Sequence, residues 1–205
     1  MKTLALMGSS VMVALLSACQ SVPAQVDLLA TAQVASDFDT YSLERVGQVP
    51  FAGPNLDHNQ ANAFQQAFFA EFSGNTPFEI VPLSVADLAE IQRSDPYRRG
   101  YYRTHTIIEL SRRFQLDGIL IGTVTAWHPF PPQRLAVQVD LLSAETGMVI
   151  WSSAIHLDAS DLTMRENLRA WYDAHPGEAG ESWELALLSP RRFIRFAAWQ
   201  IGRLL

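Results

Sequence analysis

Cys19 is the residue of this sequence whose surroundings most specifically predict a chemical modification. It is the single cysteine of the chain, and it follows the small residues Ser17 and Ala18. Before them come one positive charge at Lys2 and an apolar stretch over residues 4–16, the order found in a secretory signal. The apolar stretch is shorter than the roughly 20 residues that a membrane-spanning helix needs. We therefore predict that a signal peptide, residues 1–18, is removed.

The residues that end at Cys19 resemble a lipobox, the processing sequence of bacterial lipoproteins. This resemblance implies that the Cys19 thiol is diacylated and that the new amino terminus is acylated after cleavage. Two or more acyl chains anchor a protein stably without a spanning helix, whereas one binds a bilayer only marginally. An ordinary signal peptide that happens to contain a cysteine is the alternative. Gln20, in place of aspartate, favours the outer membrane by resemblance to enterobacterial sorting, with the protein facing the periplasm.

Two aromatic segments have the composition of a partner-binding surface. The first is a proline-rich loop, which would lose little entropy on docking and would supply aromatic side chains, the usual source of binding energy. The second interleaves arginine with tyrosine, which suits an anionic glycan, lipid headgroups or an acidic protein. The alternatives are a rigid connection packed on its own domain and a solvated loop. The candidate partner-binding residues are Trp127, His128 and Phe130 in the first segment and Tyr97, Arg98, Arg99, Tyr101 and Tyr102 in the second.

Catalytic and metal-binding patterns are absent from the sequence. The five histidines are scattered, and no two of them have the helical four-residue spacing of a metal site. Asp140 and Asp158 could work as an acid–base pair, but solvated or capping roles suit isolated carboxylates near strand ends better. There is no Gly-x-Ser-x-Gly elbow, no phosphate-binding loop and no cysteine pair. We therefore predict a protein that is not an enzyme and has neither a metal site nor a cofactor.

The composition is that of a globular, mildly acidic protein. Hydrophobic residues make up 48% and charged residues 18% of the chain, and the net charge is −6. A nucleic-acid partner needs a basic footprint, so we expect none. The length after the signal peptide fits one domain. Because the cysteine is used for the lipid, the fold must rest on its hydrophobic core without a disulfide.

The remaining chain divides into a tether and one domain. Residues 20–40 show no strong periodicity, so we predict a lipidated N-terminus and tether over residues 19–41 and a domain over residues 42–205. Asp57 caps a helix that carries a phenylalanine stripe and stops at a glycine near residues 73–75, and Ser84 caps the next helix. The predicted strands are 43–51, 78–81, 118–127, 135–142 and 148–157; the further helices are 85–92, 104–114, 162–172 and 190–205.

This order of elements predicts an α/β fold. We expect a single domain with a mixed sheet, a C-terminal antiparallel meander of three strands, and helices packed on the sheet. Gly118 and Gly122 lie in the first strand of the meander, where a glycine lets a neighbouring group approach closely.

Four segments of the predicted domain resemble a known group of periplasmic lipoprotein domains. They are Arg-Val-Gly-Gln-Val-Pro-Phe at 45–51, Phe-Glu-Ile-Val-Pro-Leu at 78–83, the strand at 115–125, and Thr-Gly-Met-Val-Ile-Trp-Ser at 146–152. They resemble the TolB amino-terminal domain and the CsgG, LpoB and PelC families, over roughly residues 42–158. The resemblance implies a role type, since members of the group are pore subunits, activators of wall synthases or export components.

The resemblance and the predicted anchor together lead to one functional hypothesis. We expect a lipid-anchored, non-enzymatic accessory protein of a cell-envelope machine that binds an envelope protein or a glycan. A homo-oligomer is compatible with this role. An oligomeric component of an outer-membrane secretion or polysaccharide-export system is the alternative, although no long amphipathic hairpin of the CsgG type is visible. An envelope hydrolase is a third reading, which requires close carboxylates or histidines in a pocket.

Overall fold

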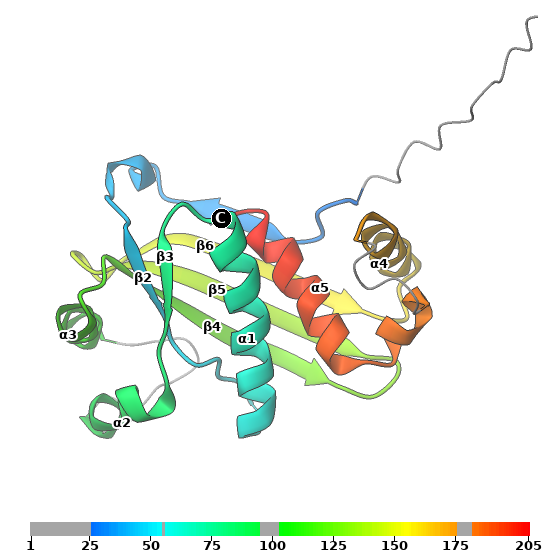
Figure 1. Ribbon diagram of the computed structural model, residues 1–205, viewed down its shortest axis with the longest axis horizontal. Coiled ribbons are helices and arrows are strands. Elements are labelled where there is room, and N and C mark those ends of the chain that lie inside the picture. Colours follow the sequence, from blue (N-terminus) through cyan, green and yellow to red (C-terminus); the bar gives the residue numbers. More distant parts are fainter. Residues whose placement is uncertain (1–25, 55, 95–102, 176–181) are drawn as a thin grey trace, which may run out of the picture.

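One six-stranded sheet organises the domain. The computed structural model describes residues 26–54, 56–94, 103–175 and 182–205, with the backbone only for residues 90–94. The strands follow the order β1-β6-β5-β4-β2-β3 across the sheet (Figure 1). They are β1 (Thr31–Val34), β2 (Arg45–Gln48), β3 (Glu79–Pro82), β4 (Gly118–His128), β5 (Arg134–Ser143) and β6 (Val149–Asp158).

The sheet is mixed, which confirms the predicted fold class. Strands β4, β5 and β6 form the predicted antiparallel meander. On one side of it, β2 runs parallel to both β4 and β3. On the other side, β1 is antiparallel to β6. Each parallel connection passes through helices, as a parallel pair of strands requires.

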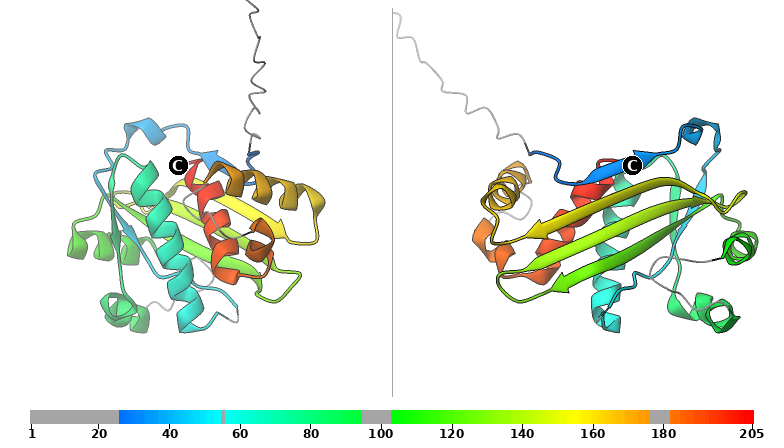
Figure 2. Two further views of the ribbon diagram at one scale, coloured as in Figure 1. Left: turned by 45° about the vertical axis from the view of Figure 1, so that its right-hand side comes forward. Right: turned by 180° about the vertical axis from the view of Figure 1, so that it is seen from behind.

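Two long helices lie across one face of the sheet, whereas the other face carries helices only at one end. The helices are α1 (His58–Asn75), α2 (Val85–Ser94), α3 (Thr104–Phe114), α4 (Leu162–Ala174) and α5 (Pro190–Gly202), with short 3-10 turns η1 (Phe38–Thr40) and η3 (Trp183–Leu187). Helices α1 and α5 lie side by side across the covered face. The view from behind shows β4, β5 and β6 without a helix over most of their length, with α2 and α3 at one end (Figure 2).

The main core lies between the sheet and the pair α1–α5. The predicted phenylalanine stripe of α1 is buried there, and Phe51 lies 4.7 Å from Phe68 and 5.8 Å from Phe64 between ring centroids. A Cβ at Gly122 would lie 2.2 Å from Cε1 of Phe51. The prediction that Gly122 admits a close neighbour is therefore confirmed, because this ring occupies the space of a side chain.

A second, smaller core lies under α2 and α3 on the other face. Leu88, Ile107 and Leu110 from the helices pack there with Ile119 and Ile121 of β4. The predicted cap of α2 is present, since Ser84 Oγ accepts the Asp87 N–H at 3.2 Å. In return, the Asp87 carboxylate accepts hydrogen bonds from the Ser84 N–H and hydroxyl, both at 2.7 Å. These hydrogen bonds, the hydroxyl's first, lower the pKa of Asp87.

The prediction of a tether over residues 19–41 needs correction. Residues 31–34 form β1 on the edge of the sheet, and residues 38–40 form η1. The residues just before β1 are also bound to the domain: the Asp27 N–H donates to Asn167 Oδ1 and the Leu29 N–H to Gln200 Oε1, each at 2.7 Å. A four-residue edge strand is too short to produce the alternation by which strands are recognised in a sequence.

The end of α1 also differs from the prediction of a glycine stop. The helix continues through Gly74 to Asn75, and among the described glycines only Gly147 has a positive φ. Side chains end the helix instead: Thr76 Oγ1 donates to the Phe72 carbonyl at 2.8 Å, and Asn75 Nδ2 donates to the Glu71 carbonyl at 2.7 Å. At its start, the predicted Asp57 cap is confirmed and forms a capping box with Gln60.

Candidate functional site

The β4–β5 hairpin divides its predicted binding residues between the core and the surface. Trp127 is half-buried and meets Phe64 edge-on at 5.3 Å between ring centroids, so its ring belongs to the packing against α1. His128 is exposed, and Phe130 stands 69% exposed at the tip of the loop. Of the three predicted residues, only His128 and Phe130 are therefore accessible to a partner without rearrangement of the core.

Gln133 joins this hairpin to two neighbouring turns. Its side chain is fully buried, and its Nε2 donates to the Leu187 carbonyl at the end of η3 at 2.8 Å. Its own carbonyl accepts the Ala159 N–H, at the start of the β6–α4 turn, at 2.8 Å. Because both partners are backbone groups, Gln133 holds the hairpin, the β6–α4 turn and the η3–α5 turn together.

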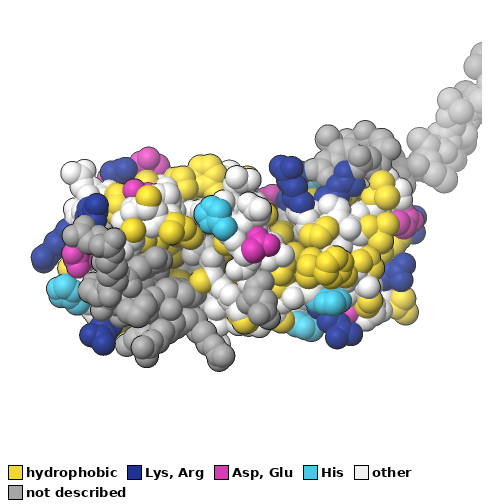
Figure 3. All heavy atoms as spheres, turned by 90° about the horizontal axis from the view of Figure 1, so that it is seen from below, with side chains coloured by type: hydrophobic (Ala, Val, Ile, Leu, Met, Phe, Trp, Pro, Cys, Tyr) yellow, Lys and Arg dark blue, Asp and Glu magenta, His cyan; other side chains and the backbone are white. Residues whose placement is uncertain are grey.

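Each of these three turns exposes apolar side chains. We give the name hairpin end to the four exposed apolar side chains at or beside these turns. Figure 3 shows hydrophobic side chains gathered on the half of the lower face away from α2 and α3, with charged and histidine side chains around them. Apolar side chains that protrude together from one surface mark a contact site more often than scattered ones do. The hairpin end comprises Phe130 (69% exposed), Leu162 (72%), Leu185 (44%) and Leu188 (59%).

Charges at the hairpin end are paired rather than of one sign. Arg134 Nε lies 2.9 Å from Asp158 Oδ2 across the β5–β6 ladder. The pKa of Asp158 is lowered by hydrogen bonds from the Ser160 hydroxyl and N–H, and less by Arg134. Arg165 lies over the Trp183 ring, 5.8 Å from its centroid. The surroundings of the apolar side chains are thus polar but close to neutral.

An open groove lies at the opposite end of the sheet, and we name it the groove end. Its volume is about 820 Å³, and it runs between the segment after η1, helix α3 and the β5–β6 turn. In Figures 1 and 2 these elements lie at the end away from α4 and the β4–β5 hairpin. The groove is lined by Thr40, Tyr41, Ser42, Leu43, Ile108, Ser111, Arg112, Gln115, Leu116, Asp117, Ser143, Ala144 and Glu145.

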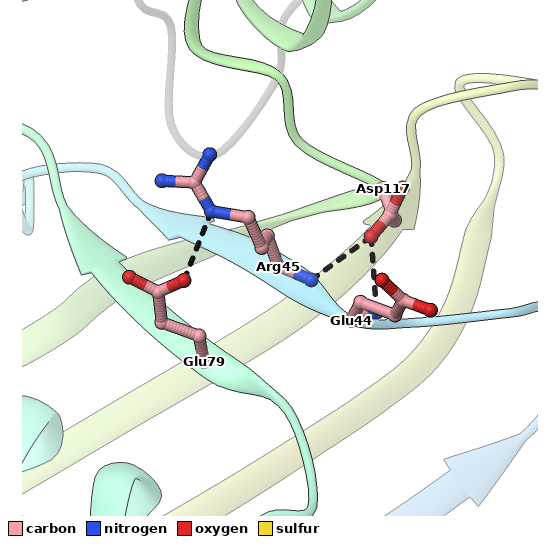
Figure 4. Close-up of polar contacts among 4 residues, drawn as sticks. All are labelled: Glu44, Arg45, Glu79 and Asp117. Atoms are coloured by element: carbon pink, nitrogen blue, oxygen red, sulfur yellow. Dashed lines mark hydrogen bonds and ion pairs between the residues drawn. The ribbon is translucent and has the colours of Figure 1, made fainter.

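Asp117 fixes the shape of the groove by binding the backbone of the strand beside it. Its Oδ2 accepts the N–H groups of Glu44 and Arg45, each at 2.9 Å (Figure 4). The Arg45 side chain in turn pairs with Glu79 on β3, with 2.9 Å between Nε and Oε2. The exposed carboxylate of Asp117 therefore already serves to start β2 in the correct register.

The groove combines an apolar floor with charges of both signs. Leu43, Ile108 and Leu116 supply apolar surface, and Tyr41 adds an aromatic ring. Its charged lining residues are one arginine, Arg112, and the two carboxylates of Asp117 and Glu145. Such a mixture does not favour a polyanion, and it matches the mixed surface of a protein segment.

Asp140 and Asp158 do not come together as an acid–base pair. In the β5–β6 ladder, Asp140 lies opposite Ser152, whereas Asp158 lies opposite Arg134. Arg134 and Asp140 are six residues apart on β5. At the rise of a strand this is about 20 Å. Asp140 accepts hydrogen bonds from Ser152 and Gln138 at the uncovered face. Among the residues whose placement the structure gives, no three histidine, cysteine, aspartate or glutamate side chains are close enough to hold a metal ion.

A third polar cluster lies between α1, α4 and α5. The Glu71 side chain is 15% exposed, and its Oε1 lies 4.0 Å from Arg195 Nε. Burial raises the pKa of Glu71, and Arg195 and His175 oppose this shift to a smaller extent. Arg195 also lies 5.9 Å above the buried ring of Trp171. Burial therefore makes the ionised form of Glu71 less favourable in the folded protein than in water.

The remaining predicted residues lie outside the described part of the chain. Cys19 precedes it, and Tyr97, Arg98, Arg99, Tyr101 and Tyr102 belong to the connection between α2 and α3. The groove end was not predicted from the sequence, because its lining comes from segments about one hundred residues apart. None of the helices in the part that the structure describes combines the length and apolar character of a membrane span.

Comparison with known proteins gives structural neighbours only. No family profile and no curated protein matches the chain. The PelC dodecamer subunit from Paraburkholderia phytofirmans has a TM-score of 0.46 at 11% identity, over 80% of this chain and 96% of that one. The LpoB C-terminal domain from Salmonella enterica has a TM-score of 0.40 at 18% identity, over 58% and 86%. TolB from Acinetobacter baumannii has 0.34 at 11% identity, over 75% and 32%. The names of these neighbours belong to the group that the sequence resembles, and all three TM-scores lie below 0.5.

Proposed function

We propose that this chain is a lipid-anchored, non-enzymatic accessory protein of a cell-envelope machine, which faces the periplasm and binds an envelope protein in its groove. The observation that carries the proposal is the position of the groove. It lies at the end of the sheet opposite α4, and the first described residues are bound to α4 and α5. A chain anchored through its N-terminus would therefore direct the groove away from the membrane.

The chemistry of the groove favours a protein segment as its occupant. Covering the apolar floor removes apolar surface from water, which stabilises the complex. Charges of both signs at the rim select a partner by complementarity. An anionic glycan would meet two carboxylates and one arginine there. A hydrolytic role would need a free pair of carboxylates, whereas Asp117 is engaged with two backbone N–H groups.

Site-specific photocrosslinking in cells tests this function. A photoreactive phenylalanine analogue at Arg112 or Glu145, both exposed beside the groove, should give an adduct with the same envelope protein. The matched control carries the analogue at His156, which is exposed on the uncovered face of β6. Equal adducts from all three positions, or none from the groove positions, would contradict the proposal. An adduct with a second copy of this chain would favour the oligomeric alternative.

The anchor is tested separately by the variant Cys19→Ser. We expect the parent chain to incorporate radiolabelled palmitate and to fractionate with outer membranes. The variant should incorporate none and should leave the membrane fraction. Palmitate incorporation by the variant would show that the cysteine is not the modified residue.

A further inference from the structure

We propose that the hairpin end is a docking surface for the bilayer that holds the anchor, so that the domain rests on the membrane through Phe130, Leu162, Leu185 and Leu188. The proposal rests on the lipid anchor of the proposed function and adds the surface and the orientation. The occupant is the lipid bilayer itself, at the depth of the headgroups and the first methylene groups.

The first argument is the short reach of the anchor. Residue 26 is the first that the structure places, and it follows Cys19 by seven residues. A chain extends by at most about 3.6 Å per residue, so this segment spans no more than about 25 Å. That is less than the length of a small domain. One side of the domain must therefore stay close to the lipid surface.

The second argument is that the point of attachment is fixed on the domain. The Gln200 side-chain amide makes two hydrogen bonds with the segment after residue 26. Its Oε1 accepts the Leu29 N–H, and its Nε2 donates to the Asp27 carbonyl at 3.0 Å. Asn167 of α4 accepts the Asp27 N–H. Both side chains are buried, so the segment cannot swing away from α4 and α5 without leaving their polar groups unpaired.

The third argument is the position of the exposed apolar side chains. Helix α4, where the chain enters the domain, begins with Leu162, and its preceding turn is held to the hairpin by Gln133. Figures 1 and 2 place α4, η3 and the β4–β5 hairpin at the same end of the molecule. Leucine and phenylalanine side chains at this end would leave water on entering the interfacial region, which favours seating of the surface.

The charges predict which lipid property matters. Arg134 is paired with Asp158, and Arg169 lies 4.0 Å from Asp173 on α4. These pairs gain little from anionic headgroups, because Arg134 and Arg169 already have carboxylate partners. We therefore expect docking on zwitterionic lipid, with little change as the salt concentration rises.

The experiment uses the full lipidated chain in phosphatidylcholine vesicles that contain brominated acyl chains. Because the lipid uses Cys19, a newly introduced cysteine is the only free thiol for a polarity-sensitive fluorophore. The docking variant is Leu188→Cys, with Leu162→Cys as a second position, and the matched control is Met148→Cys, 66% exposed in the β5–β6 turn. We expect several-fold stronger quenching at positions 188 and 162 than at 148, unchanged at high salt.

Each other outcome overturns the proposal in a recognisable way. If the chains do not float with the vesicles, the anchor is absent and both the docking and the proposed function fail. If they float but positions 188 and 162 are quenched no more than 148, the anchor stands and the docking is wrong. If these positions become protected only after envelope proteins are added, the hairpin end binds a protein instead of lipid.

Discussion

The hairpin end and the groove end differ in shape as well as in chemistry. At the hairpin end, single apolar side chains protrude from three turns that meet at the buried Gln133. At the groove end, apolar side chains line a hollow whose rim is charged and whose wall is set by Asp117. Protruding apolar groups suit a soft partner such as a lipid surface, which adapts to them, whereas a hollow suits a partner of defined shape.

Removal of the N-terminal strand should lower the stability of the domain more than any other change considered. It removes backbone pairing near α4 and α5 and leaves the residues that line the groove in place. Deleting residues 20–34 removes β1 and the backbone partners of Asn167 and Gln200. Lost ladder bonds and two unpaired buried amides should cost about 4 kcal/mol, a fall in Tm of about 10 °C. Calorimetry of the mature chain in detergent measures this.

The matched control for that deletion removes residues 20–25 only. It leaves β1 and the hydrogen bonds of Asp27 and Leu29 intact. Its Tm should stay within about 2 °C of the parent, the range of a surface change. Equal losses from both deletions would show that β1 does not stabilise the domain.

The polar residue that organises each end should also differ in its contribution to stability. Gln133→Ala leaves a cavity and an unpaired Leu187 carbonyl, so we expect a loss of about 3 kcal/mol in the free energy of unfolding. Asp117→Ala exposes two N–H groups to nearby water and should cost about 1 kcal/mol. Urea denaturation compares the two variants, and the reverse order would contradict the roles assigned to these residues.

Two carboxylates at different places in the fold should respond to pH with opposite signs. Burial raises the pKa of Glu71, so its charged form costs stability as the pH rises through the folded pKa, and Glu71→Gln should be more stable than the parent at pH 7. The Ser84 hydrogen bonds lower the pKa of Asp87, so its contribution is present above the unfolded pKa and is lost in acid. Asp87→Asn should therefore be less stable than the parent at pH 7.

Both differences should shrink as the pH falls, the first below the unfolded pKa of Glu71 and the second below the folded pKa of Asp87. Thermal unfolding from pH 3 to pH 8 follows them. A Glu71→Gln variant less stable than the parent at pH 7 would show that the ion pair with Arg195 outweighs the cost of burial.

The smallest expected effect is at the left-handed residue of the groove end. Gln115 ends α3 with a φ of 54°, which disfavours any residue except glycine. Gln115→Gly should stabilise the domain by about 0.5 kcal/mol, the relief of strain being reduced by the entropy of glycine. Gln115→Ala, the control, keeps the strain and should leave the stability nearly unchanged. A loss with glycine would mean that side-chain contacts of Gln115 outweigh its backbone strain.

The elements that sequence reasoning found are those with a strong local signal. The alternation in β5 and the glycine turn before β6 predicted the meander to within a residue at each end, and Asp57 and Ser84 predicted two helix starts. Strand β1 had no such signal, since its pairing partner lies more than one hundred residues away. The groove escaped prediction for the same reason.

The predicted binding loop shows where composition alone is insufficient. Trp127 and Phe130 are both aromatic and three residues apart, yet one packs on Phe64 and the other points to solvent. The difference follows from the pleat of β4 and from the end of the strand at His128. The turns that complete the hairpin end come from the β6–α4 and η3–α5 connections, whose leucines the sequence analysis did not single out.

The binding of residues 27–34 to α4, α5 and β6 also sets the order of events during biosynthesis. This segment is synthesised first, but its partners, such as Asn167, Gln200 and the strand at 149–158, are synthesised last. Contacts between distant parts of a chain close late and slow the folding of a domain. Residues 27–34 therefore remain without these partners until nearly the whole polypeptide has been made.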